Sequence, residues 1–305
     1  MLAFVVKHSL VGMFLCALLG FLLPAASNWL FPVLPYVLFT LMLLTLLGMP
    51  MQALMRRVMH RAMWCYGLLH CAFFMLLFTA IGLAFEVSDE LLLAVLGVGA
   101  TGSLFATPAI VRALGFDSLE AMAMTIVTTL LLPIALFIPI KWIHLSEGGL
   151  DFVTYGIRLL IFIAGPILFS YLAHRFLPQE WLKRTLVKIS PYTILLVFAF
   201  PFGLIGSYRG LWDQQASLAL WYLLLSVVLV MVFFFVTFLC YRKAGLEEAL
   251  TAAITAGNRN VLLTYSIAGS LLGPAFLPLA GALQVPTYLL PVMTKRLHRI
   301  FAKKK

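Results

Sequence analysis

The chain has 305 residues, of which 63% are apolar and only 10% charged, and its net charge is +10. This composition excludes a soluble domain, in which charged residues make up about a quarter of the chain. Apolar segments recur along the whole sequence, at roughly the twenty residues that a membrane helix needs. Segments of this length favour helices over barrel strands. We therefore predict an all-α polytopic membrane protein.

Ten transmembrane spans are predicted. Their ranges are 9–26, 31–50, 62–85, 91–114, 118–140, 152–176, 191–207, 216–241, 248–270 and 273–294. The first has an alternative interpretation as a signal peptide, because a basic start precedes an apolar run that ends in small residues. Its removal would spoil the charge pattern described next, so we expect it to be a span.

Lysines and arginines sort by loop. Of the 21, we assign 17 to one side and two, Lys141 and Arg209, to the other, with Arg158 and Arg259 left inside spans. The positive-inside rule then predicts that both termini are cytoplasmic. We expect the protein to lie in the inner (plasma) membrane of the cell. The basic tail "KRLHRIFAKKK" is expected to bind lipid headgroups rather than nucleic acid.

Helix breakers interrupt two spans in matching positions. The fourth span contains Gly97, Gly99, Gly102 and Pro108, and the ninth contains Gly257 at its centre. Each is the fourth of five, which predicts two inverted repeats, 1–140 (spans one to five) and 141–305 (spans six to ten). Paired interrupted helices in inverted repeats indicate the substrate site of a transporter. The alternative is that they are packing glycines and a tolerated proline kink.

The segments "LLLAVLGVGATGSLFATPAIVRALGFDSLEAMAMTIVTTLLLPIAL", "AAITAGNRNVLL" and "PYVLFTLMLLTLLGMPM" resemble the bile acid:sodium symporter family. The auxin efflux carrier family shares this fold type and is a near rival. The resemblance implies a core of spans three to five and eight to ten, in which broken helices four and nine cross. A panel of spans one, two, six and seven would move against this core. It also implies amphipathic organic anions as substrates and two sodium ions behind the crossing.

Carried over by position, the sodium ligands of the family are poorly kept. A serine–asparagine pair falls on Thr107 and Pro108, a glutamate on Thr255 and a glutamine on Arg259. The candidate ion-coupling residues under this resemblance are Thr107, Thr125, Thr255 and His70.

The acidic residues also argue against sodium. All eleven Asp and Glu fall in predicted loops or at span ends. A buried sodium ion needs oxygen ligands and compensating negative charge, whereas the charge at this depth is the guanidinium of Arg259, which is always protonated. We therefore expect no metal or cofactor. The alternative within this class is a sodium:organic acid symporter whose ion is held by neutral oxygens.

Arg259 is the central candidate, because an ionisable residue inside a span marks a functional site by default. We hypothesise that it replaces the coupling cation and binds the negative group of the substrate. Freed backbone amides and the side chains of Asn258, Asn260, Thr255 and Thr107 would complete the site. The alternative is that Arg259 only caps the carbonyls freed by the broken helices.

His70 lies well inside a span, unlike the other histidines, and its titration range suits a proton coupler. The alternative is a packed, neutral histidine.

The sequence thus predicts a secondary transporter of a small organic anion, of the carboxylate class, that works by alternating access. An enzyme is not expected, because the polar residues gather at mid-depth rather than at one leaflet. A non-transporting membrane sensor or partner subunit is the alternative from another class.

Overall fold

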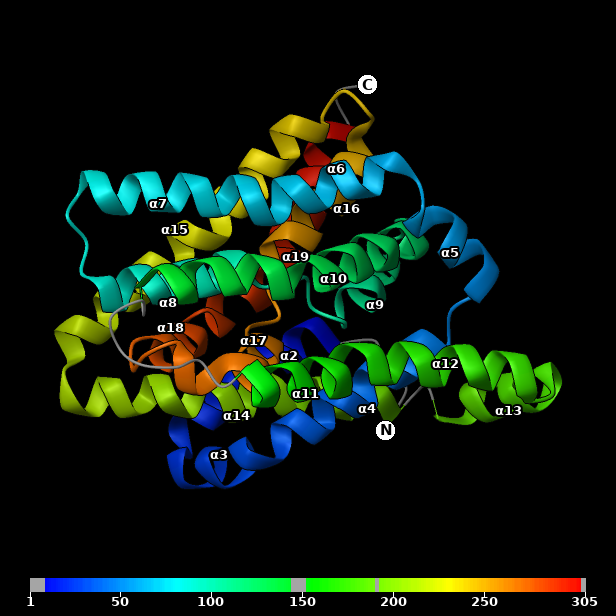
Figure 1. Ribbon diagram of the computed structural model, residues 1–305, viewed down its shortest axis with the longest axis horizontal. Coiled ribbons are helices and arrows are strands. Elements are labelled where there is room, and N and C mark those ends of the chain that lie inside the picture. The colour runs from blue at the N-terminus through cyan, green and yellow to red at the C-terminus, as the bar shows by residue number, and fades with distance from the viewer. Residues whose placement is uncertain (1–8, 144–151, 190–191, 303–305) are drawn as a thin grey trace.

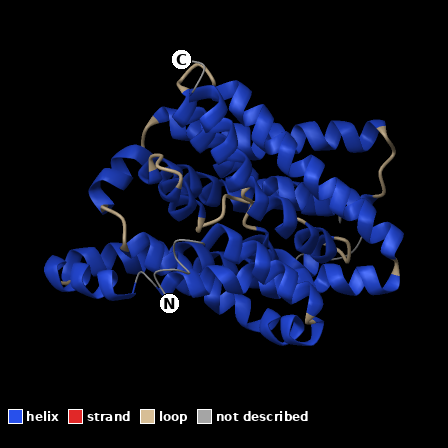
Figure 2. Cartoon of the chain, turned by 180° about the vertical axis from the view of Figure 1, so that it is seen from behind, coloured by secondary structure: helices blue, strands red, loops and turns tan. Residues whose placement is uncertain are grey.

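The computed structural model describes residues 9–143, 152–189 and 192–302, and this part of the chain is helical without strands (Figure 2). Seven of its helices are long and apolar enough to cross a bilayer. They are Pro24–Leu47, Arg61–Ala84, Ser118–Ile143, Val153–Phe176, Thr193–Gln214, Ala216–Tyr241 and Phe276–Phe301. The prediction of an all-α, multi-pass membrane protein is confirmed at this level.

Several long helices consist of consecutive pieces. In chain order the α-helices are α2 (Ser9–Leu22), α3 (Pro24–Leu30), α4 (Leu34–Leu47), α5 (Met51–Val58), α6 (Arg61–Leu68), α7 (Phe74–Ala84), α8 (Asp89–Ala100), α9 (Thr107–Ala113), α10 (Ser118–Ile143), α11 (Phe152–Leu159), α12 (Gly165–Phe176), α13 (Gln179–Ile189), α14 (Thr193–Gln214), α15 (Ala216–Tyr241), α16 (Leu246–Gly257), α17 (Val261–Ala268), α18 (Phe276–Ala282) and α19 (Gln284–Ala302). Short 3-10 or π-helical turns are η1 (Phe31–Val33), η2 (Leu69–Phe73), η3 (Leu160–Ala164) and η5 (Gly269–Leu271).

The helices form two groups, one above the other in Figure 1. The upper group holds α6–α10, α15 and α16, and the lower group holds α2–α4 and α11–α14. Helix α16 packs against α15, α19 and α10, whereas α17, its continuation, packs against α4 and α11. The predicted ninth span therefore passes from one group to the other.

Close helix packing in the lower group depends on small residues. A Cβ atom on Gly20 of α2 would overlap the carbonyl of Phe202 on α14, so glycine lets the two backbones approach. Ser27 of α3 adds a hydrogen bond, with Oγ donating to the same carbonyl at 2.7 Å. These contacts join the chain's N-terminal helices to a segment almost two hundred residues away.

The predicted boundary of the first span is wrong. Helix α2 ends at Leu22, whereas the span was expected to reach residue 26, and a new helix begins at Pro24. Proline has no N–H to donate, and its ring disfavours helical geometry in the preceding residue. Leu23 accordingly has φ −119° and ψ 64°, outside the helical region.

Two segments that we expected to be loops are helices. They are α5 and α13, whose basic and apolar residues alternate with helical spacing in "MQALMRRV" and "QEWLKRTLVKI". A search for apolar spans misses such amphipathic helices, because their mean hydropathy is low. Helices α14 and α19 also run past the predicted span ends at residues 207 and 294. Near the end of α14, Arg209 and Asp213 form an i,i+4 ion pair at 2.8 Å.

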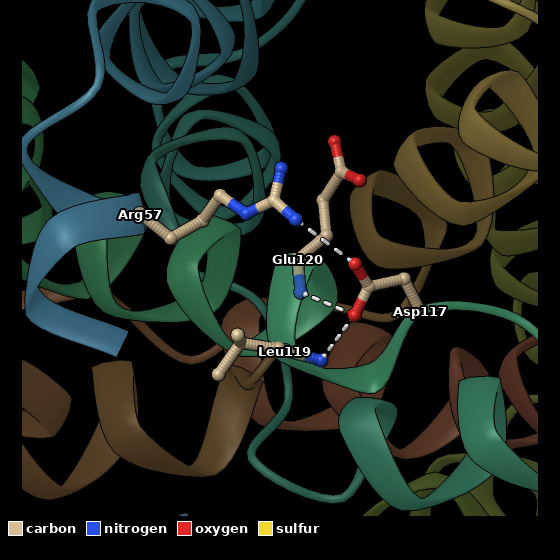
Figure 3. A network of polar contacts seen from close by, with 4 residues as sticks. All are labelled: Arg57, Asp117, Leu119 and Glu120. Carbon is tan, nitrogen blue, oxygen red and sulfur yellow. Dashed lines mark hydrogen bonds and ion pairs between the residues drawn. The ribbon is translucent and has the colours of Figure 1, made fainter. Parts of the chain in front are cut away.

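The start of α10 is set by Asp117 (Figure 3). Its Oδ1 accepts hydrogen bonds from the backbone N–H groups of Leu119 at 2.8 Å and Glu120 at 3.2 Å, as an N-cap does. Its Oδ2 accepts from Arg57 of α5 at 3.1 Å. This exposed ion pair contributes little stability, but it ties α5 to the beginning of α10.

Candidate functional site

Two helices are interrupted where the sequence predicts. Helix α8 ends at Ala100 and α9 begins at Thr107, and α16 ends at Gly257 and α17 begins at Val261. Thr101 has ψ 131° and Asn258 has ψ 89°, so the backbone leaves helical geometry at the first residue of each gap. The prediction of two broken helices is confirmed.

The two gaps pair with each other. Ser103 and Arg259 form an isolated antiparallel bridge. The N–H of Leu104 donates to the carbonyl of Asn258 at 2.8 Å, and the N–H of Asn260 donates to that of Gly102 at 2.9 Å. We call residues 101–106 and 258–260 the crossing. Because backbone groups freed in one helix are satisfied by the other, each interruption stabilises its partner.

The crossing packs directly on α10. A Cβ atom on Gly102 would lie 3.1 Å from the backbone N and Cα of Thr129. The N–H of Ser103 donates to Oγ1 of Thr128 at 3.1 Å, and Oγ of Ser103 donates to the carbonyl of Thr255 at 2.7 Å. Glycine at 102 permits this close contact, since a side chain there would need the backbone of α10 to move by a few tenths of an ångström.

The guanidinium of Arg259 binds backbone carbonyls. Its Nη1 donates to the carbonyls of Thr101 at 2.9 Å, Gly99 at 3.0 Å and His70 at 3.2 Å. The side chain is only 4% exposed. Nη1 thus caps carbonyls at the end of α8 and in η2, whereas Nε and Nη2 are buried without a hydrogen-bond partner among the described residues.

Aromatic rings complete the surroundings of this charge. The Cζ atom lies 3.7 Å from the centroid of the Phe233 ring and 5.4 Å from that of Phe74, within the range of cation–π attraction. No Asp or Glu in the described parts of the chain is buried. Glu147 and Asp151 lie outside those parts. The positive charge of Arg259 is therefore compensated by carbonyl dipoles and ring faces rather than by a described carboxylate.

Other polar atoms at the crossing are buried without a hydrogen-bond partner among the described residues. They include Nδ2 and Oδ1 of Asn258, Nδ2 of Asn260 and Oγ1 of Thr107. Asn258 and Asn260 flank Arg259 in the second gap. Buried polar groups are usually paired, so these unpartnered atoms mark a candidate ligand site.

Asn260 also begins helix α17. Its Oδ1 accepts from the N–H of Leu263 at 3.3 Å, which is the bond of an N-cap residue. The N-terminal end of α17 thus lies at the crossing, and a helix N-terminus carries partial positive charge.

His70 has partners at both ring nitrogens. Nε2 donates to the carbonyl of Thr101 at 3.0 Å, and Nδ1 lies 3.2 Å from Oη of Tyr66. Because a carbonyl only accepts, Nε2 carries a proton, and the hydroxyl of Tyr66 lies within reach of both Nδ1 and the carbonyl of Ala252, the latter at 3.4 Å. A fully buried ring held in this way matches the interpretation of His70 as a packed, neutral histidine.

The predicted threonines differ in their contacts. Oγ1 of Thr255 donates to the carbonyl of Thr251 at 2.6 Å, and Oγ1 of Thr125 to that of Ala121 at 2.8 Å, each within its own helix. Thr125 lies one turn before Thr128, which contacts the crossing. Thr107, as described above, is the member of this set whose hydroxyl is left without a described partner.

Sequence reasoning missed two participants. Oγ1 of Thr264 lies 2.6 Å from Oγ1 of Thr101, and this contact joins α17 to the end of α8. Phe233 of α15 covers the guanidinium of Arg259. Nothing in the local pattern around either residue marks it, because both act through a contact with a distant segment.

A cavity of about 810 Å³ lies between the two groups of helices. It is lined by the C-terminal end of α4, by α9 and by α13, and its charged or polar members include Arg112, His174, Glu180 and Lys183. Asn258, Arg259 and Asn260 do not line it. The cavity therefore lies next to the basic residues Arg112 and Lys183, which we call the basic end of the molecule, and does not reach the crossing.

No protein-family model matches this chain, and no curated protein is significantly similar to it.

Proposed function

We propose that the protein is a secondary transporter of a small organic anion, of the carboxylate class, that works by alternating access without sodium coupling. The observation that carries this proposal is the buried positive charge of Arg259, which no described carboxylate neutralises, at a crossing of two interrupted helices. Interrupted helices that meet inside a membrane protein are a recurrent way to build a substrate site.

The proposal gives the chain ten spans in two inverted repeats. Seven are the long apolar helices, one is α2, and two are the interrupted pairs α8–α9 and α16–α17, which makes ten. Both termini would then lie on the cytoplasmic side of the inner membrane, together with the basic ends of α5, α9 and α13. The auxin carrier and bile acid symporter families have this arrangement, and the resemblance in sequence supports it.

The anion would bind at the crossing, next to Asn258, Asn260 and Thr107. Their unpartnered amide and hydroxyl groups supply hydrogen-bond donors, and the N-terminus of α17 adds partial positive charge. Arg259 contributes its charge; its Nη1 is engaged by carbonyls, whereas Nε and Nη2 have no described partner and remain as donors. An anion is the ligand that this surplus of positive charge and donors favours.

Movement between the two groups of helices would give the anion access to the site at the crossing. The cavity at the basic end separates α9 of the upper group from α4 and α13 of the lower group. Elsewhere α14 of the lower group is held to α18, where Oγ of Ser207 donates to the carbonyl of Leu277 at 2.8 Å. Extension of the cavity toward Thr107 would expose the anion site on one side of the membrane.

The test is uptake of labelled mono- and dicarboxylates into proteoliposomes, with sodium or choline as the external cation. We compare the wild type with Asn258→Ala, Arg259→Gln and a matched control, Arg209→Gln, which removes a partly exposed arginine that is ion-paired to Asp213. We expect uptake to be the same in sodium and choline, to be lost in the first two variants and to be kept in the control.

Two results would count against the proposal. Uptake that follows a sodium gradient would mean that neutral oxygens hold a coupling ion, as in the alternative symporter. Undiminished uptake by Asn258→Ala and Arg259→Gln, with both variants folded, would remove the crossing from the substrate pathway.

A further inference from the structure

We propose that the carbonyl cluster at the crossing is a cation-binding site that the protein fills with its own guanidinium, so that truncation of Arg259 creates a site for a free guanidinium ion. This inference concerns the binding of a cation and stands apart from the proposed transport of an anion.

The first step of the argument is the convergence of acceptors from separate elements. The carbonyls of Gly99 and Thr101 come from the end of α8, where the helix stops and its next turn is missing. The carbonyl of His70 comes from the π-helical turn η2, in which the register of backbone hydrogen bonds is shifted. All three lie within 3.2 Å of one nitrogen atom. Because Nη1 carries only two N–H bonds, the three oxygens surround it as they would surround a cation.

The second step is the electrostatics of the cluster. Carbonyl dipoles that point at one place create a negative potential there, and rings add the negative faces of their π-systems. Phe233 lies against the flat face of the guanidinium, with Cζ 3.7 Å from the ring centroid. Removal of the charge would leave the buried acceptors of Gly99 and His70 without this donor and the carbonyl of Thr101 with one partner fewer.

The third step is that these residues do not fit a free sodium ion while Arg259 is present. Sodium would need the oxygens that Nη1 already engages, and it would place a second positive charge beside the first without a buried described carboxylate. The tethered guanidinium cannot dissociate. The crossing therefore keeps its bound cation whether the site is open to one side of the membrane or to the other. This gives a physical reason for transport without a coupling ion.

The experiment measures thermal unfolding of purified Arg259→Ala in detergent as a function of millimolar guanidinium chloride, well below denaturing concentrations. We expect a saturable upward shift in Tm, because a ligand that binds only the folded protein stabilises it. Urea tests the same shape without charge, and tetramethylammonium chloride tests the same charge and ionic strength in a larger ion. Neither should raise Tm in this way.

The wild type and Arg209→Ala are the matched controls. Both retain the guanidinium of Arg259, so neither should respond to the added ion. The proposal is overturned if Arg259→Ala folds and its Tm does not rise with guanidinium, or if urea or the controls produce the same rise.

If the alanine variant does not fold, Arg259→Met tests the same proposal. Methionine is similar in length, uncharged and apolar, so it fills the space without satisfying the carbonyls. We expect a lower Tm than that of the wild type. A Tm equal to or above the wild-type value would show that the cluster does not need a cation, and would overturn the proposal without reference to any substrate.

Discussion

The first gap in the crossing separates α8 from α9 by six residues, 101–106, whereas the second separates α16 from α17 by only three, 258–260. The longer gap and the end of α8 before it supply small residues and acceptors: Gly102 packs on α10, and the carbonyls of Gly99 and Thr101 receive hydrogen bonds. The shorter gap supplies the donor, Arg259, and two amide side chains. The two halves of the crossing are complementary rather than equivalent, because one brings negative dipoles and the other a full positive charge.

The largest effect is expected from Gly102→Ala, which tests the packing role of the first gap. The added Cβ atom would lie 3.1 Å from the backbone of Thr129 and push the crossing away from α10. We expect the free energy of unfolding in detergent to fall by about 1–3 kcal/mol, as for other overpacked sites. Gly210→Ala, in a helix with no neighbour within 4 Å of the new atom, is the control. If the control loses as much stability as Gly102→Ala, the close contact is not the cause.

A second prediction concerns the hydroxyl contact that joins the two interrupted helices. Thr101 donates to the carbonyl of Gly97 at 2.7 Å, so Thr264 must donate to Thr101 across the 2.6 Å contact. A double-mutant cycle of Thr101→Val and Thr264→Val should give a coupling free energy of about 1 kcal/mol, near the upper part of the range for membrane proteins. Unfolding free energies that simply add would show that the two hydroxyls do not interact.

A smaller effect is expected at the beginning of α17, the half-helix that follows the second gap. Asn260→Ala removes the side-chain oxygen that accepts from the N–H of Leu263 at 3.3 Å. Loss of such a cap costs about 1 kcal/mol of stability. Because Asn260 also belongs to the proposed anion site, carboxylate uptake should fall by more than the loss of stability explains. Asn260→Ser, which can still cap α17, should recover stability without full uptake.

The smallest effect is expected at the beginning of α9, the half-helix that follows the first gap. Helix α9 has no side-chain cap, and Pro108 instead stands in its first turn, where the missing N–H is not needed. Pro108→Ala should lower the free energy of unfolding by only about 0.5 kcal/mol, chiefly through greater freedom of the unfolded chain. If Pro108→Ala lowers the free energy of unfolding more than Asn260→Ala does, the proposed contrast between the N-termini of α9 and α17 is wrong.

Several features could be predicted from the sequence because their cause is local. Glycine and proline weaken a helix wherever they stand, so both interruptions were located correctly. The sustained apolar composition likewise predicts membrane helices. Span ends were less predictable: the start of α3 depends on Pro24, and the ends of α14 and α19 extend through polar residues that hydropathy places in loops. Amphipathic helices α5 and α13 were missed for the same reason.

The environment of Arg259 shows where local reasoning ends. Its charge and depth are evident from "GNRN", and so is the shortage of nearby acids. The choice between a ligand and the freed carbonyls is not local, because the oxygens belong to residues about 160 and 190 positions earlier in the chain. The same holds for Phe233, whose ring meets the guanidinium only after α15 packs near the crossing.

Residue types alone were enough to predict a helical membrane protein with two interrupted segments and a buried positive charge, since composition, helix breakers and ionisation act at the level of single residues. The three-dimensional fold was needed to show that the interruptions pair with each other, that carbonyls and aromatic rings contact Arg259, and that Asn258 and Asn260 keep polar atoms without described partners. Hydrogen bonds and packing contacts link residues far apart in the chain, and a buried polar atom acquires its partners only when those segments meet.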